Sequence, residues 1–525
     1  MKKLIIFGIV MVVTFNACNK DDFADSYADP SKISTSTVEK MFSGFIYTNR
    51  DYVLKAYWNY FVVLRTTLTH YTQSVGWING TAQYIPGEAG IGARWGNYYS
   101  FLAHYREMEK MYNGLTQEEQ DDLRIYMITA TIYLYDHTEK VVDLHGAIPF
   151  SEAGKLSQNG GDYQNSLPAY DSAEAVYTTM LDGLKGFADE LNSMNISDNA
   201  LKSFEVQDFV NNGDIELWKK YCNSLRLRML TRVSAASEFQ ARSQAEISSI
   251  LGNPSQYPVV DNNTENIQID VHDLDSRINS KGFKGGLEDW DGNIAGKKMI
   301  DHMLGNADPR LRAMFEPGEQ AGGNYLGLDP LMDQSDQQEL FNTRTVSIYN
   351  RSTLSRNQYF PGVLMTAAEV SMLKAEAYVK DNNNGMAKSS YEEAISQSIG
   401  FYYLVRTVSN DEISGPLTPY TNDEVLAYTG SDAVNWDNAA NNEERMALIA
   451  TEKWIHFSVV MLPESWAELR RLNFDLAFQP DNSSTQSLPP DRWIYPSNEK
   501  TSNTENYNAV SAGDNLTTKI FWDVN

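Results

Sequence analysis

The segment 214–234 carries apolar side chains around more than half of a helical circumference. One stripe, at spacings of three and four residues, is formed by Trp218, Tyr221, Cys222, Leu225, Met229 and Val233. Leu217, Leu227 and Leu230 lie off that stripe. A helix with this pattern is buried among other helices rather than laid on a surface. We therefore expect residues 214–234 to form a central core helix around which the chain is organised.

Three arginines interrupt the apolar character of this helix: Arg226, Arg228 and Arg232. A buried guanidinium group needs carboxylate or carbonyl partners, because an unpaired charge in the core is costly. Charge partners in helical cores are more often structural than catalytic. The pattern predicts structural ion pairs and no chemistry for this helix.

Helical periodicity returns along most of the remaining chain, which predicts an all-α framework. Further helices are expected over residues 38–68, 95–111, 117–142, 171–191, 239–252, 443–461 and 465–473. Residues 365–399 resemble one tetratricopeptide-type helical hairpin around an Asn-Gly turn, since that repeat is about 34 residues long. Two stretches lack periodicity: the glycine-rich residues 70–96, and residues 254–360, where short Val/Ile pieces suggest strands. Long irregular segments of this kind are usually functional. We expect one helical domain over residues 37–525, with these loops on one face.

The N-terminus has the pattern of a lipoprotein signal peptide. Lys2 and Lys3 precede ten apolar residues, too few to span a membrane. Cys18 follows a small residue at the spacing of a bacterial lipobox, so residues 1–17 are expected to be removed and Cys18 to be lipidated. Residues 18–36, rich in Asp, Ser and Thr, are expected to form a flexible tether. The Lys-Asp-Asp run at 20–22 resembles the signal that sends lipoproteins to the outer face of the outer membrane.

Composition narrows the class of partner. The chain of 525 residues has a formal net charge of −26, which argues against nucleic acid or an anionic membrane surface. After removal of residues 1–17 and lipidation of Cys18, Cys222 is the remaining thiol, and its place on the apolar stripe makes it a packing residue. No later segment holds the ~20 unbroken apolar residues of a membrane span.

No catalytic, cofactor or metal motif stands out in the sequence. The seven histidines form no HExxH pair, and no GxGxxG or P-loop follows a strand. Two Asp/Asn-rich fragments, 289–293 and 381–385, resemble calcium loops, but their glycines are misplaced and we expect solvated turns. We expect a protein that is not an enzyme, with no catalytic residues, no cofactor and no metal.

Aromatic side chains in the loops are the candidate ligand contacts. Sugar rings present apolar faces that stack on Trp and Tyr, while their hydroxyls need planar polar groups nearby. Trp77 and Tyr84, with Asn79 and Gln83 between them, provide that mixture in the first loop; Trp290 and Tyr325 lie in the second. The alternative for each ring is ordinary core or rim packing. We predict Trp77, Asn79, Gln83, Tyr84, Trp290 and Tyr325 as ligand-binding residues.

Five segments in order resemble the SusD/RagB family of outer-membrane nutrient-binding lipoproteins. They are AIPFSEA (147–153), WKKYCNSLRLRMLTRVS (218–234), DPRL (308–311), MTAAEVSMLKAEAY (365–378) and RWIYPSNEKTSNTENY (492–507). The resemblance implies an all-α SusD-like fold with tetratricopeptide-type hairpins. In the family, the segment after the first helices supplies part of the ligand-facing platform, which points to the Trp77 loop. Ala147 stands where the family more often has an acid, so that acid's role does not carry over.

The resemblance also implies a function. Family members lie over a SusC-type TonB-dependent outer-membrane transporter and bind a glycan or, in some branches, a peptide. We therefore expect a cell-surface lipoprotein of the outer membrane that captures an oligosaccharide or polysaccharide and delivers it to such a transporter. The alternatives are a RagB-like peptide binder in the same position and a polymer-cleaving enzyme.

Overall fold

The structure, a computed structural model, describes residues 36–481 and 486–525. The predicted signal peptide, Cys18 and all of the tether except Ser36 lie outside the described residues. None of the helices in the described ranges combines the length and the apolar character that crossing a membrane requires.

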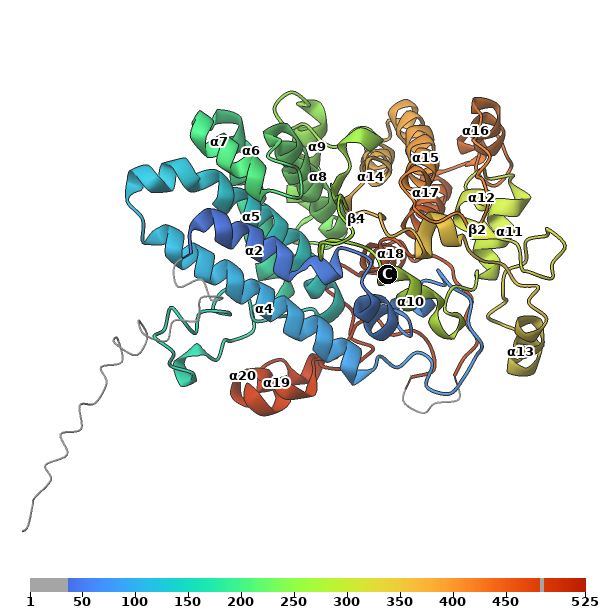
Figure 1. Ribbon diagram of the computed structural model, residues 1–525, viewed down its shortest axis with the longest axis horizontal. Coiled ribbons are helices and arrows are strands. Elements are labelled where there is room, and N and C mark those ends of the chain that lie inside the picture. The colour runs from blue at the N-terminus through green and yellow to red at the C-terminus, as the bar shows by residue number, and fades with distance from the viewer. Residues whose placement is uncertain (1–35, 482–485) are drawn as a thin grey trace, which may run out of the picture.

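The N-terminal half of the chain is a bundle of helices (Figure 1). Its α-helices are α2 (Val38–Thr48), α3 (Leu68–Tyr71), α4 (Glu88–Asn113), α5 (Gln117–His145), α6 (Ala173–Ser193), α7 (Asp198–Gln207), α8 (Ile215–Val233) and α9 (Gln240–Gly252). Between α2 and α3 lie a 3₁₀ turn, η1 (Arg50–Tyr52), and a π-helix, η2 (Asn59–Leu64). A further short turn is η3 (Gln164–Ser166).

The middle of the chain is irregular, as the lack of periodicity predicted. Its helices are short: α10 (Phe283–Glu288), α11 (Lys297–Gly305), α12 (Leu311–Met314) and α13 (Gln334–Asn342). The turns are η4 (Asn263–Glu265), η5 (Asp289–Asp291) and the π-helical η6 (Arg351–Ser355). Two antiparallel pairs join β1 (Ile267–Ile269) to β4 (Gly362–Met365) and β2 (Phe315–Glu316) to β3 (Ile348–Tyr349).

Helices return in the C-terminal part of the chain. They are α14 (Ala367–Lys380), α15 (Asn384–Thr407), α16 (Asn422–Thr429), α17 (Asn442–Phe457), α18 (Leu462–Arg471), α19 (Ser497–Ser502) and α20 (Thr504–Asn508), with turns η7 (Trp436–Asn438) and η8 (Ser511–Gly513). In Figure 1, α14, α15 and α17 stand beside the α8–α9 side of the bundle, and α18 lies between the two halves. The all-α framework expected from the sequence is confirmed.

Helix α8 is the buried centre that its pattern predicted. Asp214 caps it by accepting hydrogen bonds from the backbone N–H groups of Glu216 and Leu217, at 2.9 and 3.1 Å. From Tyr221 to Val233 every side chain is buried. The helix packs against α5, α6, α9 and α14. Such all-round burial requires that its arginines find acidic partners inside the core.

The arginines of α8 do find these partners, on four different helices. Arg226 pairs with Glu246 of α9 at 2.6 Å. Arg228 pairs with Glu369 of α14 at 2.6 Å and with Asp136 of α5 at 2.8 Å. Arg232 pairs with Glu464 of α18 at 2.7 Å. Removal of one partner from such a buried pair typically costs about 3–5 kcal/mol, because a buried charge is left uncompensated. The prediction of structural ion pairs is confirmed.

Helices α14 and α15 form the expected hairpin, but the turn lies two residues earlier than predicted. Asn382 occupies the left-handed region at φ 56°, and the Asn383 side chain caps α15 by accepting a hydrogen bond from the Met386 N–H. Gly385 lies inside α15. Asparagine tolerates left-handed backbone and can cap a helix, so the asparagine pair makes the turn and the glycine is not needed for it.

Two predicted boundaries near the N-terminus are wrong. The helix expected over residues 38–68 ends at Thr48, and the chain continues through η1 and η2. Helix α4 begins at Glu88, not at Trp95, and includes Gly90, Gly92 and Gly96 of the supposed loop. Gly90 faces the backbone of η2: a Cβ atom there would lie 2.9 Å from the Val62 carbonyl oxygen. This glycine therefore permits close helix packing, where the sequence suggested a break.

Candidate functional site

An exposed tryptophan, Trp290, marks the most prominent aromatic surface of the middle region. Its side chain is 80% exposed. It belongs to η5, where Trp290 and Asp291 both have left-handed backbone, at φ 56° and 58°. A bulky residue in this region is a genuine outlier, and such strain tends to persist at binding sites. The backbone thus holds a large apolar ring in solvent at a conformational cost.

Trp290 contacts side chains from η2, which lies more than 220 positions earlier in the chain. Its ring meets Phe61 edge to face, with centroids 5.4 Å apart, and Tyr57 stacks on Phe61 at 5.0 Å. The Arg65 guanidinium lies 4.8 Å from the Phe61 centroid and 5.2 Å from the Trp290 centroid. We call Tyr57, Phe61, Arg65 and Trp290 the Trp290 cluster. Its rings and guanidinium form a surface suited to stacking flat ligands.

Glycines let the two backbones of the cluster approach each other. Helix α10 precedes Trp290 and packs against η2 through Gly282, Gly285 and Gly286. A Cβ atom on Gly285 would lie 2.9 Å from the Tyr57 ring, and one on Gly286 would lie 2.7 Å from the Tyr60 Cβ. A larger residue at either position would move η2 and with it the Tyr57 and Phe61 rings.

A polar cleft of about 500 Å³ is lined by residues that flank Trp290 in sequence. Its lining includes Glu288, Asp291, Asn293, Arg344, Arg351 and Arg356. The three arginines are paired with Glu319, Glu316 and Glu288 respectively, each at 2.8 Å. The volume is typical of small-ligand pockets, and the lining offers planar donors and acceptors. Aromatic surface and polar cleft together present what a sugar requires.

The structure places the four predicted residues of the first loop differently from Trp290. Trp77 is 8% exposed, stacks on His70 at 4.4 Å and donates its Nε1–H to Gln83 Oε1 at 3.0 Å. Tyr84 is fully buried and donates its hydroxyl to the Gln479 carbonyl at 2.9 Å. Asn79 donates to the Pro330 carbonyl at 2.8 Å. These side chains bind the loop to neighbouring segments and offer no free ring face to a ligand.

Tyr325, the last predicted residue, is half-buried against the core that underlies the first loop and α11. It lies outside the Trp290 cluster, and so does the Trp77 loop. The six residues are therefore not brought together, and their role in ligand binding stays a prediction. Tyr57, Phe61 and Arg65 were missed. Tyr57 and Phe61 fall within the helix expected over residues 38–68, which in the structure ends at Thr48.

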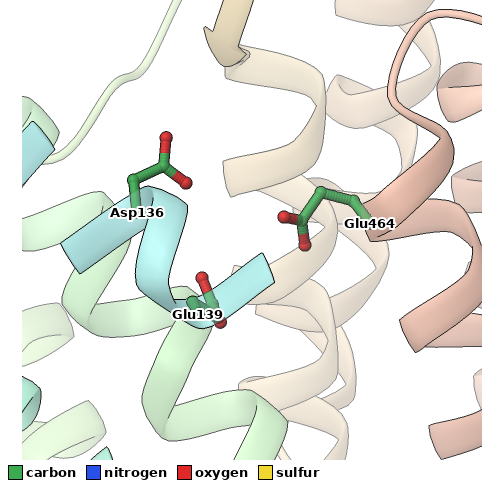
Figure 2. Close-up of side chains that lie close together, drawn as sticks. All are labelled: Asp136, Glu139 and Glu464. Carbon is green, nitrogen blue, oxygen red and sulfur yellow. The ribbon is translucent and has the colours of Figure 1, made fainter. Parts of the chain in front are cut away.

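Three buried carboxyl groups converge inside the helical framework: Asp136, Glu139 and Glu464, each offering an oxygen within 4.8 Å of the others. Figure 2 shows Asp136 and Glu139 on one helix and Glu464 facing them from another. Arg228 already occupies their centre, with Nη1 2.8, 3.8 and 3.6 Å from the three groups in that order. A guanidinium group thus supplies the positive charge that a metal ion would bring.

The pKa values agree with an arginine-centred cluster. Burial, reinforced by the nearby Glu464 charge, raises the pKa of Glu139 well above its usual range. Burial acts in the same direction on Asp136, but Lys140 and Arg228 outweigh it and hold the pKa of Asp136 below its usual value. The pKa values of Glu139 and Asp136 are thus shifted in opposite directions by their surroundings. The arrangement stabilises the fold and is out of reach of any polymer.

The chain is similar to known proteins over most of its length. A family profile described as "Starch-binding associating with outer membrane" matches residues 29–496. No curated protein sequence matches the chain.

Several solved structures share its fold. A chitin-binding protein is 21% identical, with a TM-score of 0.72 and coverage of 92% of this chain and 100% of its own. A SusD homologue from Bacteroides fragilis is 17% identical, with a TM-score of 0.74 and coverage of 93% and 100%. A SusD homologue from Bacteroides uniformis is 22% identical, with a TM-score of 0.67 and coverage of 92% and 99%.

The resemblance inferred from the five sequence segments is confirmed by these matches. Identities below 25% speak for the fold alone, whereas the profile covers almost the whole helical framework and the Trp290 cluster. The chain therefore belongs to the SusD-like family of starch-binding proteins that associate with the outer membrane.

Proposed function

We propose that the protein binds an oligosaccharide or polysaccharide at the Trp290 cluster and the adjoining cleft, and does not cleave it. The observation that carries this proposal is Trp290 itself, 80% exposed on a left-handed backbone and in edge contact with Phe61. The sugar ring stacks on the aromatic surface while its hydroxyls reach the guanidinium, carboxylate and amide groups of the cleft. The family description and the chitin-binding neighbour support a glycan ligand.

The same proposal places the protein at the cell surface. Cys18 carries the lipid, the tether spans residues 18–36, and the bound glycan passes to a SusC-type TonB-dependent transporter. The resemblance of the N-terminus to a lipoprotein signal supports the anchor, and the family's association with the outer membrane supports the location.

Binding of defined glycans and peptides, measured by calorimetry and affinity electrophoresis, tests the proposed ligand class. Trp290→Ala is expected to weaken glycan binding, whereas Tyr163→Ala, which removes a ring 55% exposed elsewhere, should not. Affinity should change little with salt, because no ion pair to a neutral sugar is formed. Peptide binding that falls steeply with salt would support the peptide alternative, and release of product from a polymer would support an enzyme.

Anchoring is tested separately by Cys18→Ala. The variant is expected to be unacylated and to leave the membrane fraction while keeping the same melting temperature. Fatty-acid labelling of the variant, or its retention in the outer membrane, would contradict a lipid anchor at this position.

A further inference from the structure

A second cleft, of about 600 Å³, lies along α15, and we call it the α15 cleft. Its lining comes from α15, from Asn263 of η4 and from the segment 417–420, which leads into α16. None of these lining residues belongs to the Trp290 cluster or lines the cleft beside it. Most of the α15 residues in the lining share one face of the helix: Ser396, Gln397, Gly400, Tyr403, Leu404 and Thr407. The volume is typical of pockets for small ligands.

Gly400 forms the floor of the α15 cleft. A Cβ atom built on it would lie 2.9 Å from Asn263 Nδ2 and 3.7 Å from the Tyr420 hydroxyl oxygen. Glycine is less favourable than alanine inside a helix, but here it lets the Asn263 amide lie against the helix backbone. Gly400 therefore brings an amide and a hydroxyl group to the same point of the cleft.

Tyr403 and Tyr420 form an aromatic wall of the α15 cleft. Their ring centroids are 4.8 Å apart, with the ring planes at 64°. The Tyr403 hydroxyl donates to the Pro309 carbonyl at 2.9 Å. Arg312 donates to the two backbone carbonyls that precede Tyr420, both at 3.2 Å. Among the described residues, no group forms a hydrogen bond with the Tyr420 hydroxyl. The wall is thus fixed in place, and its second hydroxyl is available to a ligand.

Asn263 and Gln397 form a polar wall and hold each other in position. The Asn263 backbone N–H donates to Gln397 Oε1 at 3.1 Å, and Asn263 Nδ2 donates to the Gln397 carbonyl at 2.8 Å. Gln397 Nε2 donates to Glu393 Oε1 at 2.5 Å. A side-chain amide carries two N–H donors, and within the described chain these bonds use one donor of each amide. A second donor of each amide is therefore left for a ligand.

The α15 cleft offers little charge to a ligand. Arg406 is the one charged side chain in its lining within the described ranges. Its guanidinium donates to the backbone carbonyls of Asp411 at 2.8 Å and Gly415 at 2.7 Å. A neutral molecule with an apolar face and several hydroxyl groups matches an aromatic wall beside a wall of amides.

We propose that the α15 cleft is a second binding site of this protein for a neutral saccharide. One sugar ring lies against Tyr403 and Tyr420, and its hydroxyl groups bond to the Asn263 and Gln397 amides and to the Tyr420 hydroxyl. The choice of a saccharide rests on the proposed function, whereas the cleft itself does not. Two sites on one chain raise the affinity for a glycan long enough to reach both, because the second contact is intramolecular.

Trisaccharides are the probe, because they are too short to reward contact with two separate sites. Calorimetry with maltotriose and chitotriose should detect binding that remains in Trp290→Ala. In that background, Tyr420→Ala and Gly400→Ala should each weaken the remaining binding about tenfold, by loss of a stacking ring and by displacement of the Asn263 amide. Gly385→Ala is the matched control: it lies in the same helix, its added Cβ meets no atom within 4 Å, and it should bind like its background.

The variants separate this proposal from the proposed function. Unchanged binding in both Tyr420→Ala and Gly400→Ala would overturn the second site, while a loss in Trp290→Ala alone would still support the first. Loss in these two variants beside an unaffected Trp290→Ala would leave the α15 cleft as the saccharide site and remove the Trp290 cluster. A peptide that binds the α15 cleft where both sugars fail would overturn the choice of a saccharide. Should Tyr420→Ala fail to fold, Gly400→Ala against Gly385→Ala still decides.

Discussion

Two aromatic loops that look alike in sequence end in opposite environments. The Trp77 loop and the Trp290 turn both place large rings among Gly and Asn. In the first, the rings are covered by segments from elsewhere in the chain: Gln83 N–H donates to Asp481, and Asn79 N–H donates to Gln337 at 2.7 Å. In the second, the ring stays in solvent on a strained backbone. What separates a buried ring from an exposed ring here is the cover supplied by residues distant in sequence.

The largest predicted difference between the two loops is in how much each ring contributes to the stability of the fold. Tyr84→Ala should lower the free energy of unfolding by about 3–5 kcal/mol, because it empties a fully buried site and removes the shorter of two hydrogen bonds to the Gln479 carbonyl. Trp290→Ala should change it by no more than about 0.5 kcal/mol, as exposed substitutions do. Denaturant unfolding of both variants measures the difference. Equal losses would show that the two rings do not differ as described.

A second test uses pH, because the Trp77 loop contains His70 whereas the Trp290 turn contains no histidine. Burial against Trp77 lowers the pKa of His70 to about 4, from 6.5. The unfolded chain takes up a proton below pH 6.5 and the folded chain does not until about pH 4. Stability is therefore lost as pH falls through this window, on the order of 3 kcal/mol in total.

His70→Phe keeps an aromatic stack but removes the titration, so the stability of this variant should fall less between pH 6.5 and 4. Unfolding measured across this range compares the slopes. His104→Phe, an exposed position on α4, is the control and should keep the parent slope. The same slope in His70→Phe and the parent would mean that His70 takes up its proton equally in both states.

Ligand binding gives the third and smaller effect. Trp290→Ala should weaken glycan binding about tenfold, or ~1.4 kcal/mol, which is the lower range of ring stacking. Trp77→Phe, which keeps a ring in the packed loop, should leave the affinity unchanged. Calorimetry with the best glycan of the panel measures both. A Trp77→Phe protein that binds tenfold more weakly, beside an unaffected Trp290→Ala, would return the site to the first loop.

The smallest predicted effect tests whether the backbone of the Trp290 turn is strained. Asp291→Gly should raise the free energy of unfolding by about 0.5 kcal/mol, because glycine adopts φ near 58° without a steric cost. Asp289→Gly is the matched control: its φ is −59°, so glycine there adds only chain entropy and should lower stability by a similar amount. Thermal unfolding of the two variants measures these changes in stability. A loss of stability in both variants would show that the turn is not strained.

The helical framework was predictable because periodicity reports burial directly. Cys222, Leu225 and Met229 repeat at helical spacing, and the helix α8 forms as this pattern predicts. The sequence predicted that the arginines of this helix pair with acidic groups, but it did not predict which ones. The partners Asp136, Glu369 and Glu464 are distant in sequence. Patterns within one segment carry no information on which other segment will cover it.

The same limit explains why the residues of the Trp290 cluster were predicted only in part. Composition singled out Trp290 and Tyr84 equally, whereas the cover over Tyr84 comes from residues near 479. Tyr57 and Phe61 lie within the helix expected over residues 38–68, and the π-helix that contains Phe61 has no periodic signature of its own. Local pattern indicates which residues are able to bind a ligand, and tertiary packing decides which of them stay exposed.

The glycines of α10 have a consequence for how this surface can change. Gly286 lies against the Tyr60 Cβ, and Gly285 lies against the Tyr57 ring itself. Exchange of Trp290 for another aromatic residue would alter the shape offered to a ligand and leave these contacts unchanged. A larger ring at position 57 would press on Gly285, so variation in ligand specificity is open at Trp290 and constrained at Tyr57.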